Sequence, residues 1–110
     1  MATNYKVLGQ TAPSATTATT LYTVPADTQA VVSTLFVCNR GTSQATFRIS
    51  LRPDGAAQND AMYLFYDVQI DPNATIPITT GITLGDTDVL TVYASTADLS
   101  FSACGSEITA

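Results

Sequence analysis

Two apolar runs within residues 23–52 constrain the fold more than any other part of the chain. In the second run, 45–52, apolar and polar residues alternate, which is typical of a β-strand with one buried and one solvent-facing side. The first run, 30–38, is apolar at both parities, which predicts a strand that is covered on both faces. The second cover is either an outer layer of the domain or a partner molecule. Residues 39–44 between them have turn chemistry, so we predict that the two strands form an antiparallel hairpin.

Strand-like segments continue at regular intervals along the rest of the chain. Gly, Pro, Asn and Asp turn signals separate them about every ten residues, and no segment has a helical period. The predicted strands lie at 4–8, 21–24, 30–38, 45–52, 62–70, 75–84, 88–95 and 99–104. About eight short strands predict a single all-β domain over residues 1–110, an antiparallel β-sandwich of the jelly-roll kind. The expected core includes Phe47, Ile49, Leu51, Leu99 and Phe101.

Glycine and proline signals refine this prediction. Gly9 is expected to end the first strand, and Gly105 is expected to break the last one. Pro77 lies inside 75–84, which predicts an edge strand or a break, and Gly81 predicts a bulge or bend in the same segment.

Residues 11–20 form a segment of low complexity that is rich in Thr and Ala. It has no periodicity and many β-branched residues, so we predict an extended arm or a long loop rather than a helix. Because an arm of this kind can lie along a neighbouring molecule, Thr16 and Thr17 are candidate interface residues.

The charge content excludes some classes of partner. Charged residues make up 12% of the chain, against about 25% in an ordinary domain. The formal net charge is −5 and there is no basic run, so nucleic acid and anionic membrane surfaces are not expected partners. A surface with few charges is easily buried against copies of itself, and the strands at 31–38 and 62–70 offer more apolar surface than one core needs. We expect a homotrimer, with a dimer or a larger ring as alternatives.

The sequence also bears on where the protein is made. The N-terminal residues have no apolar segment of the signal-peptide kind, and no apolar run approaches the ~20 residues of a membrane span. We therefore expect a soluble protein that is made in the cytosol. Cys38 and Cys104 are expected to be buried free thiols, because immunoglobulin-type pairing would also require a core Trp and the chain has none.

The sequence offers little catalytic chemistry. It contains no His, which removes the commonest general base and metal ligand, and we expect neither an enzyme nor a cofactor. Most of the nine carboxylates lie at predicted turns, where Asp bonds the following backbone amides. The alternative is a calcium site at Asp86 and Asp88, completed by Asp27 or Asp71 if these loops cluster.

Arginine and aromatic residues on two strands are candidates for a contact surface. Arg48 and Arg52 share the polar face of 45–52, where they either solubilise the strand or bind a carboxylate on a partner. Strict alternation in 62–70 places Tyr63 and Phe65 on one face and Tyr66 on the other. Together with Tyr22 these aromatic side chains either pack in the core or form a contact surface such as a sugar-binding platform.

Several short strings, taken in order, resemble small virion proteins of tailed bacteriophages, many of them from aquatic hosts including cyanobacteria. The strings are 2–10 (ATNYKVLGQ), 20–25 (TLYTVP), 30–34 (AVVST), 37–41 (VCNRG), 51–53 (LRP), 81–84 (GITL) and 89–95 (VLTVYAS). The resemblance runs nearly end to end and implies a structural component of the virion, with no catalytic residues to carry over.

The resemblance leaves the position on the particle open. A capsid decoration (cement) protein, bound to the major capsid protein in many copies, is the reading that the Thr-rich arm and the low charge favour. A tail, collar, baseplate or fibre protein is the alternative, with tail proteins as partners. A carbohydrate-binding module for the host surface is a further alternative.

Overall fold

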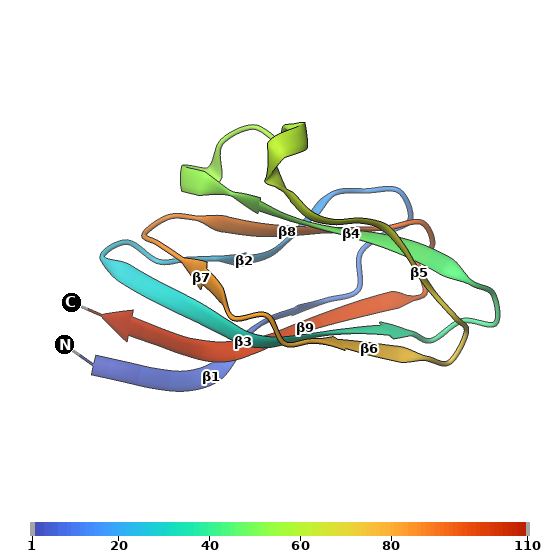
Figure 1. The fold of residues 1–110 in the computed structure, drawn as a ribbon, viewed down its shortest axis with the longest axis horizontal. Helices are drawn as coiled ribbons and strands as arrows, with labels where there is room; N and C mark the ends of the chain where they lie inside the picture. The colour runs from blue at the N-terminus through green and yellow to red at the C-terminus, as the bar shows by residue number, and fades with distance from the viewer. Residues whose placement is uncertain (1, 110) are drawn as a thin grey trace.

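The computed structural model describes residues 2–109, which form two packed β-sheets and two short 3-10 helices (Figure 1). The elements in chain order are β1 (Ala2–Thr11), β2 (Thr19–Thr23), β3 (Thr28–Asn39), β4 (Ala45–Arg52), η1 (Pro53–Gly55), η2 (Asp60–Met62), β5 (Tyr63–Ile70), β6 (Thr75–Ile78), β7 (Ile82–Leu84), β8 (Val89–Ala94) and β9 (Leu99–Thr109). Neither these two helices nor any other helix within residues 2–109 has the length and apolar character needed to cross a membrane.

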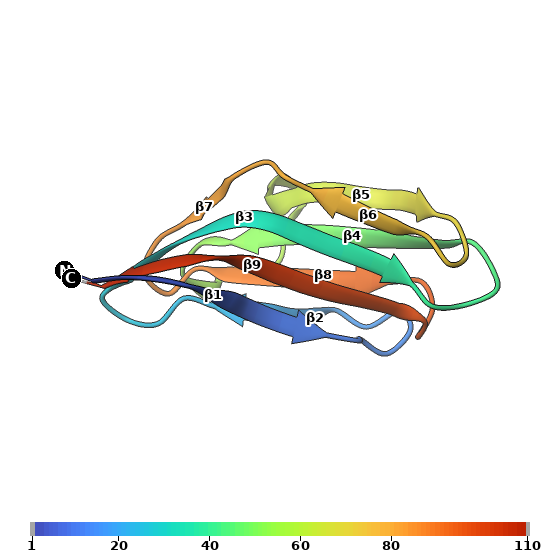
Figure 2. The same cartoon turned by 90° about the horizontal axis from the view of Figure 1, so that it is seen from below.

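The strands form an antiparallel sandwich. The larger sheet has the order β1-β9-β3-β6, with β7 also paired to β3, and the smaller sheet has the order β2-β8-β4-β5. Figure 2 shows the larger sheet crossing in front of the smaller one. When β6 and β7 are counted as one interrupted strand, this is the strand order of a jelly roll, as predicted. The interruption follows Pro77 and includes Gly81, whose φ is 67°.

The predicted hairpin between the first two long strands is wrong. β3 pairs with β9, β6 and β7, whereas β4 pairs with β8 and β5, so residues 40–44 cross from one sheet to the other. Asn39 holds this crossing: its side-chain amide donates to the carbonyls of Ser43 and Ile70, and its Oδ1 accepts from the Gly41 N–H. Turn residues suit a hairpin and a crossing equally well, because both reverse the chain.

The prediction that an outer layer of the domain covers the second face of 30–38 is wrong, because the two sheets leave that face of β3 at the surface. Cover by a partner molecule stays a prediction. β3 also contains a bulge. The register with β9 shifts between Val32 and Thr34, and this shift exchanges the faces of the residues on either side. Val32 and Leu35 therefore both point into the core, while Val31 and Phe36 lie on the opposite side. The apolar residues at both parities are the consequence of the bulge.

Two glycines predicted to end or break strands lie inside them. β1 continues past Gly9 to Thr11 with a bulge at Leu8, and β9 continues past Gly105 to Thr109. Gly105 lies opposite the β3 bulge, where an added Cβ would be 1.9 Å from the Val31 carbonyl oxygen. A residue without a side chain is therefore required where β3 comes this close to β9.

The core fills the space between the sheets. Phe47, Ile49, Leu99 and Phe101 are fully buried as predicted, and Leu51 is half-buried at the margin. The rings of Phe47 and Phe101, one from each sheet, meet edge to face with their centroids 6.1 Å apart. This contact is a favourable arrangement for two aromatic rings and ties the sheets together at the centre of the sandwich.

The Thr-rich segment 11–20 connects the two sheets. Thr11 ends β1, Thr19 begins β2, and residues 12–18 between them cross the end of the sandwich. The Thr16 N–H donates to the Ala94 carbonyl at 2.8 Å, which holds this connection against β8. Thr16 and Thr17 are exposed at the turn of the connection.

Candidate interaction surfaces

The larger sheet has an outer face that carries no Asp, Glu, Lys or Arg side chain among the described residues of β1, β3 and β9. It comprises Thr3, Tyr5, Val7, Gln10, Gln29, Val31, Thr34, Phe36, Cys38, Ser100, Ser102, Cys104, Ser106 and Ile108. Lys6 lies among these strands, but its side chain turns to the other side of the sheet and pairs with Glu107. The charges of the chain are thus carried by its turns, by the smaller sheet and by this internal pair.

The outer face is partly apolar and gently hollowed. Tyr5 is 86% exposed, Val7 51% and Phe36 39%, so three large apolar side chains face solvent on one sheet. A hollow of about 520 Å³ lies between β1, β9 and β3 near Tyr5 and Val7, and a second of about 380 Å³ lies near Phe36. A surface that combines exposed apolar side chains with an absence of charge resembles the centre of a protein interface.

Both cysteines belong to this outer face. They are free thiols, as predicted, but they are half-exposed rather than buried. Cys38 is opposite Ser100 and Cys104 is opposite Thr34 in the β3–β9 register. The two thiols therefore mark two separate points on the same surface.

The smaller sheet carries a different kind of surface, centred on Arg48. Its guanidinium carbon lies 4.2 Å from the centroid of the Tyr66 ring and 4.4 Å from that of Tyr93. Its Nε and Nη2 donate to the two carboxylate oxygens of Asp67 at 2.7 and 3.3 Å. These hydrogen bonds raise the pKa of Arg48 above its ordinary value, and the cation is fixed by two rings and one anion.

A bulge in β5 creates this arrangement. The register between β4 and β5 shifts after Phe47, and Asp67 adopts a left-handed φ of 52° there. The shift brings Tyr66 to the outer side beside Arg48 and turns Phe65 inward, where its ring centroid is 6.5 Å from that of Phe47. The predicted alternation through β5 is therefore wrong, and Phe65 packs against the core.

Tyr63 adjoins the Arg48 cluster. Its ring meets the Tyr66 ring nearly edge to face, with centroids 4.8 Å apart and an interplanar angle of 81°. The two rings and Asp60 line a hollow of about 330 Å³. Asp60 is held there by a short 3-10 helix, η2, that Asn59 caps by accepting from the Ala61 N–H.

Arg52, the second arginine of β4, has a local structural role. Its guanidinium donates to the backbone carbonyls of Gly55 and Ala56 at 2.9 and 2.7 Å. These bonds fasten the turn after β4 to the end of the strand. The structure thus separates the two predicted arginines: Arg48 belongs to the aromatic cluster and Arg52 holds a turn.

The acidic residues proposed as calcium ligands bond backbone amides. Asp88 accepts from the N–H groups of Gly85 and Asp54 at 2.8 and 3.0 Å, and Asp86 accepts from the Asp27 N–H at 3.1 Å. Within residues 2–109 no three His, Cys, Asp or Glu side chains are placed to hold a metal ion. These contacts support the turn reading of Asp86 and Asp88 over the calcium alternative.

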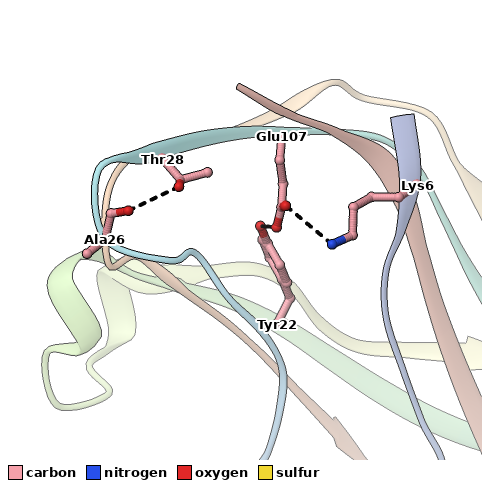
Figure 3. A network of polar contacts seen from close by, with 5 residues as sticks. All are labelled: Lys6, Tyr22, Ala26, Thr28 and Glu107. Carbon is pink, nitrogen blue, oxygen red and sulfur yellow. Dashed lines mark hydrogen bonds and ion pairs between the residues drawn. The ribbon is translucent and has the colours of Figure 1, made fainter. Parts of the chain in front are cut away.

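A buried polar network, which the sequence did not reveal, joins the sheets at one end of the sandwich (Figure 3). Glu107, on β9, accepts a hydrogen bond from the Tyr22 hydroxyl on β2 and pairs with Lys6 on β1 at 3.3 Å. Glu107 and Tyr22 are 8% and 7% exposed. The Tyr22 hydrogen bond and Lys6 lower the pKa of Glu107 against the opposing effect of burial, while burial and the Glu107 carboxylate raise the pKa of Tyr22.

Comparisons with protein-family models, curated proteins and solved structures gave no match for this chain. The fold and its surfaces therefore define its class: a small jelly-roll domain with an uncharged outer face on one sheet and an aromatic cluster around Arg48 on the other.

Proposed function

We propose that the protein is a non-catalytic structural component of a bacteriophage virion that binds the outside of the assembled capsid as a decoration protein. The observation that carries the proposal is the uncharged outer face of the larger sheet, with Tyr5, Val7 and Phe36 exposed on it. The sequence strings that resemble virion proteins of tailed phages point to the particle as the partner. On this proposal the protein is made in the host cytoplasm and ends in the virion.

The outer face has the size of a modest interface. The three strands that carry it, β1, β3 and β9, have 10, 12 and 11 residues. At about 4.8 Å spacing and about 33 Å length they give roughly 480 Å² per partner. Specific interfaces bury about 800 Å² per partner, so one copy would bind with moderate affinity. A decoration protein needs no higher affinity per copy. Because it binds only the assembled shell, it stabilises the shell by mass action, and many copies act on one particle.

The same outer face would also suit a ring of copies in the tail, collar or baseplate. Copy number separates these positions: hundreds of copies per virion indicate the capsid, and roughly three to a few dozen indicate the tail, as the closed symmetry of small rings requires. Self-association, most simply as a homotrimer, is part of the proposal. Light scattering should then give three times the chain mass of 11.5 kDa.

The reactivity of the two cysteine thiols tests which surface of the protein attaches to the capsid. On intact particles, Cys38 and Cys104 should both be protected from a maleimide that labels them on the released protein, because both lie on the outer face. Phe36→Asp should prevent attachment while the domain stays folded. Leu64→Asp is the matched control, since Leu64 is 43% exposed on β5 of the other sheet.

Depletion tests the role on the particle. Particles that lack the protein should form normally but break at a lower temperature or a smaller osmotic shock. Wild-type heat resistance together with loss of tail integrity would reject the capsid position in favour of the tail. Equal labelling of both thiols on particles and on released protein would reject the outer face as the attachment surface.

A further inference from the structure

We infer that the hollow lined by Asp60, Tyr63 and Tyr66 is a binding site for a neutral saccharide. Tyr63 and Tyr66 belong to β5 of the smaller sheet, whereas the outer face belongs to the larger sheet. It therefore does not rest on the proposed attachment to the capsid, and a docked copy would leave it open to solvent.

The aromatic rings of the site are held in place before any ligand binds. Tyr66 is 56% exposed, and a tyrosine this exposed would ordinarily move between rotamers. Here one side of the Tyr66 ring is stacked on Arg48, and the ring also meets Tyr63 at 4.8 Å. Arg48 is in turn fixed by Asp67 and Tyr93. A rigid ring loses little conformational entropy on binding, which is what a weakly binding ligand requires.

The side chains match the two sides of a sugar ring. A pyranose has a face of C–H groups that packs against the electron-rich face of an aromatic ring, and hydroxyls at its edge that donate hydrogen bonds. Tyr63 and Tyr66 supply the rings, and Asp60 supplies a carboxylate to which no side chain within residues 2–109 donates a hydrogen bond. The hollow, about 330 Å³, is shallow and lined by these three residues, so a bound sugar ring would contact them on one side and bind weakly.

The charges of the site favour a neutral ligand over an anionic one. Arg48 lies against the Tyr66 ring, and its guanidinium already donates to both carboxylate oxygens of Asp67. Asp60 adds a negative charge at the hollow itself. A phosphate, a sulfate or an acidic sugar would therefore meet a carboxylate without a free cation to balance it.

The experiment uses the whole isotope-labelled chain and neutral methyl glycosides of glucose, galactose, mannose and N-acetylglucosamine. Each is added to about 20 mM, which nearly saturates a site with a Kd of about 1 mM. At least one should produce saturable shifts in the backbone amide resonances of Asp60, Tyr63 and Tyr66. Tyr66→Ala should weaken this binding about tenfold or more, equivalent to at least about 1.4 kcal/mol.

Two controls keep the result interpretable. Tyr5→Ala removes a tyrosine of the other sheet that is even more exposed, 86% against 56%, and should leave saccharide binding unchanged. Asp60→Ala touches neither the stacked rings nor Arg48, so weaker binding in this variant reports on the carboxylate alone. The inference is overturned if none of the four glycosides gives saturable shifts at these residues, or if binding survives Tyr66→Ala in a protein whose spectrum shows a native fold.

Discussion

The Tyr22 hydroxyl donates a hydrogen bond to the Glu107 carboxylate across the interior of the sandwich (Figure 3). Tyr22 belongs to the smaller sheet and Glu107 to the larger one, so this bond links the two layers at the end where Lys6 completes the network. If the Tyr22 hydroxyl is removed, the buried Glu107 carboxylate loses a hydrogen-bond donor but still bears the free-energy cost of its burial. Stability should therefore be sensitive to substitution of either residue.

Tyr22→Phe should lower the free energy of unfolding by about 1.5–3 kcal/mol, the usual range for a hydrogen bond to a charged group. The ring remains to fill its place, so the loss reports on the hydroxyl. Chemical denaturation measures the effect. Tyr5→Phe removes an exposed hydroxyl and should change stability by less than about 0.5 kcal/mol; equal losses in the two variants would contradict the role of the pair.

Stability should fall at both ends of the pH range because of the same network. The pKa of Glu107 is held below its ordinary value of 4.5, so its contribution is complete above that value and is lost as the pH falls through the folded-state pKa. The pKa of Tyr22 is raised above its ordinary value of 10.0, so its contribution is complete below pH 10.0 and is lost as the pH rises further. Denaturant midpoints measured across pH should fall both in acid (the acid limb) and above pH 10 (the alkaline limb).

Variants assign the two limbs of that profile. Glu107→Gln should flatten the acid limb. Tyr22→Phe should flatten the alkaline limb and also reduce the acid limb, because the Tyr22 hydrogen bond is the main cause of the lowered pKa of Glu107. An acid limb that is unchanged in Glu107→Gln would mean that other carboxylates, such as those capping the turns, govern the loss of stability in acid.

Gly105→Ala should destabilise the protein by more than about 3 kcal/mol, because the new Cβ would meet backbone atoms of Val31 rather than a flexible side chain. Gly81→Ala is a matched control in which only the backbone conformation opposes the change. No other atom lies within 4 Å of the added Cβ at Gly81, and its φ of 67° costs an L-residue about 1–2 kcal/mol. Thermal melts should rank Gly105→Ala as the less stable variant.

Phe101→Ala should lower the free energy of unfolding by about 3–5 kcal/mol, as expected for removing a fully buried aromatic ring. Phe36→Ala, on the neighbouring strand but on the outer face, should cost less than about 1 kcal/mol because the ring is partly solvated already. A small loss for Phe101→Ala would show that the two sheets close over the vacated space.

Local sequence was sufficient to locate the strands. Alternation in 45–52 and the turn signals around it depend on neighbouring residues alone, and each predicted segment overlaps a strand of the structure. The partner of each strand was not predictable in this way. Whether residues 39–44 close a hairpin or cross between sheets depends on β8 and β9, which lie about 50 residues further along the chain.

The surfaces were predictable only in part. Alternation correctly placed Arg48 on the polar face of β4, but the bulges at Ser33 and Asp67 exchanged inside and outside for the residues beyond them. Asp67 carried a usable signal, because Asp is unfavourable in a strand and tolerates a left-handed φ. Glu107, the only Glu of the chain, gave a similar signal by lying within an apolar strand, but its partners Lys6 and Tyr22 are at least 85 residues away.

The position of β9 between β1 and β3 affects how the chain can fold as it is synthesised. β9 follows the other eight described strands along the chain, yet it lies between β1 and β3 in the larger sheet. Pairing over such separations is slow, and strands that wait for a partner expose unpaired edges. When β1 through β8 have been synthesised, β1 and β3 therefore have no strand between them with which to pair. The larger sheet can form only after β9 has left the ribosome and inserted between them.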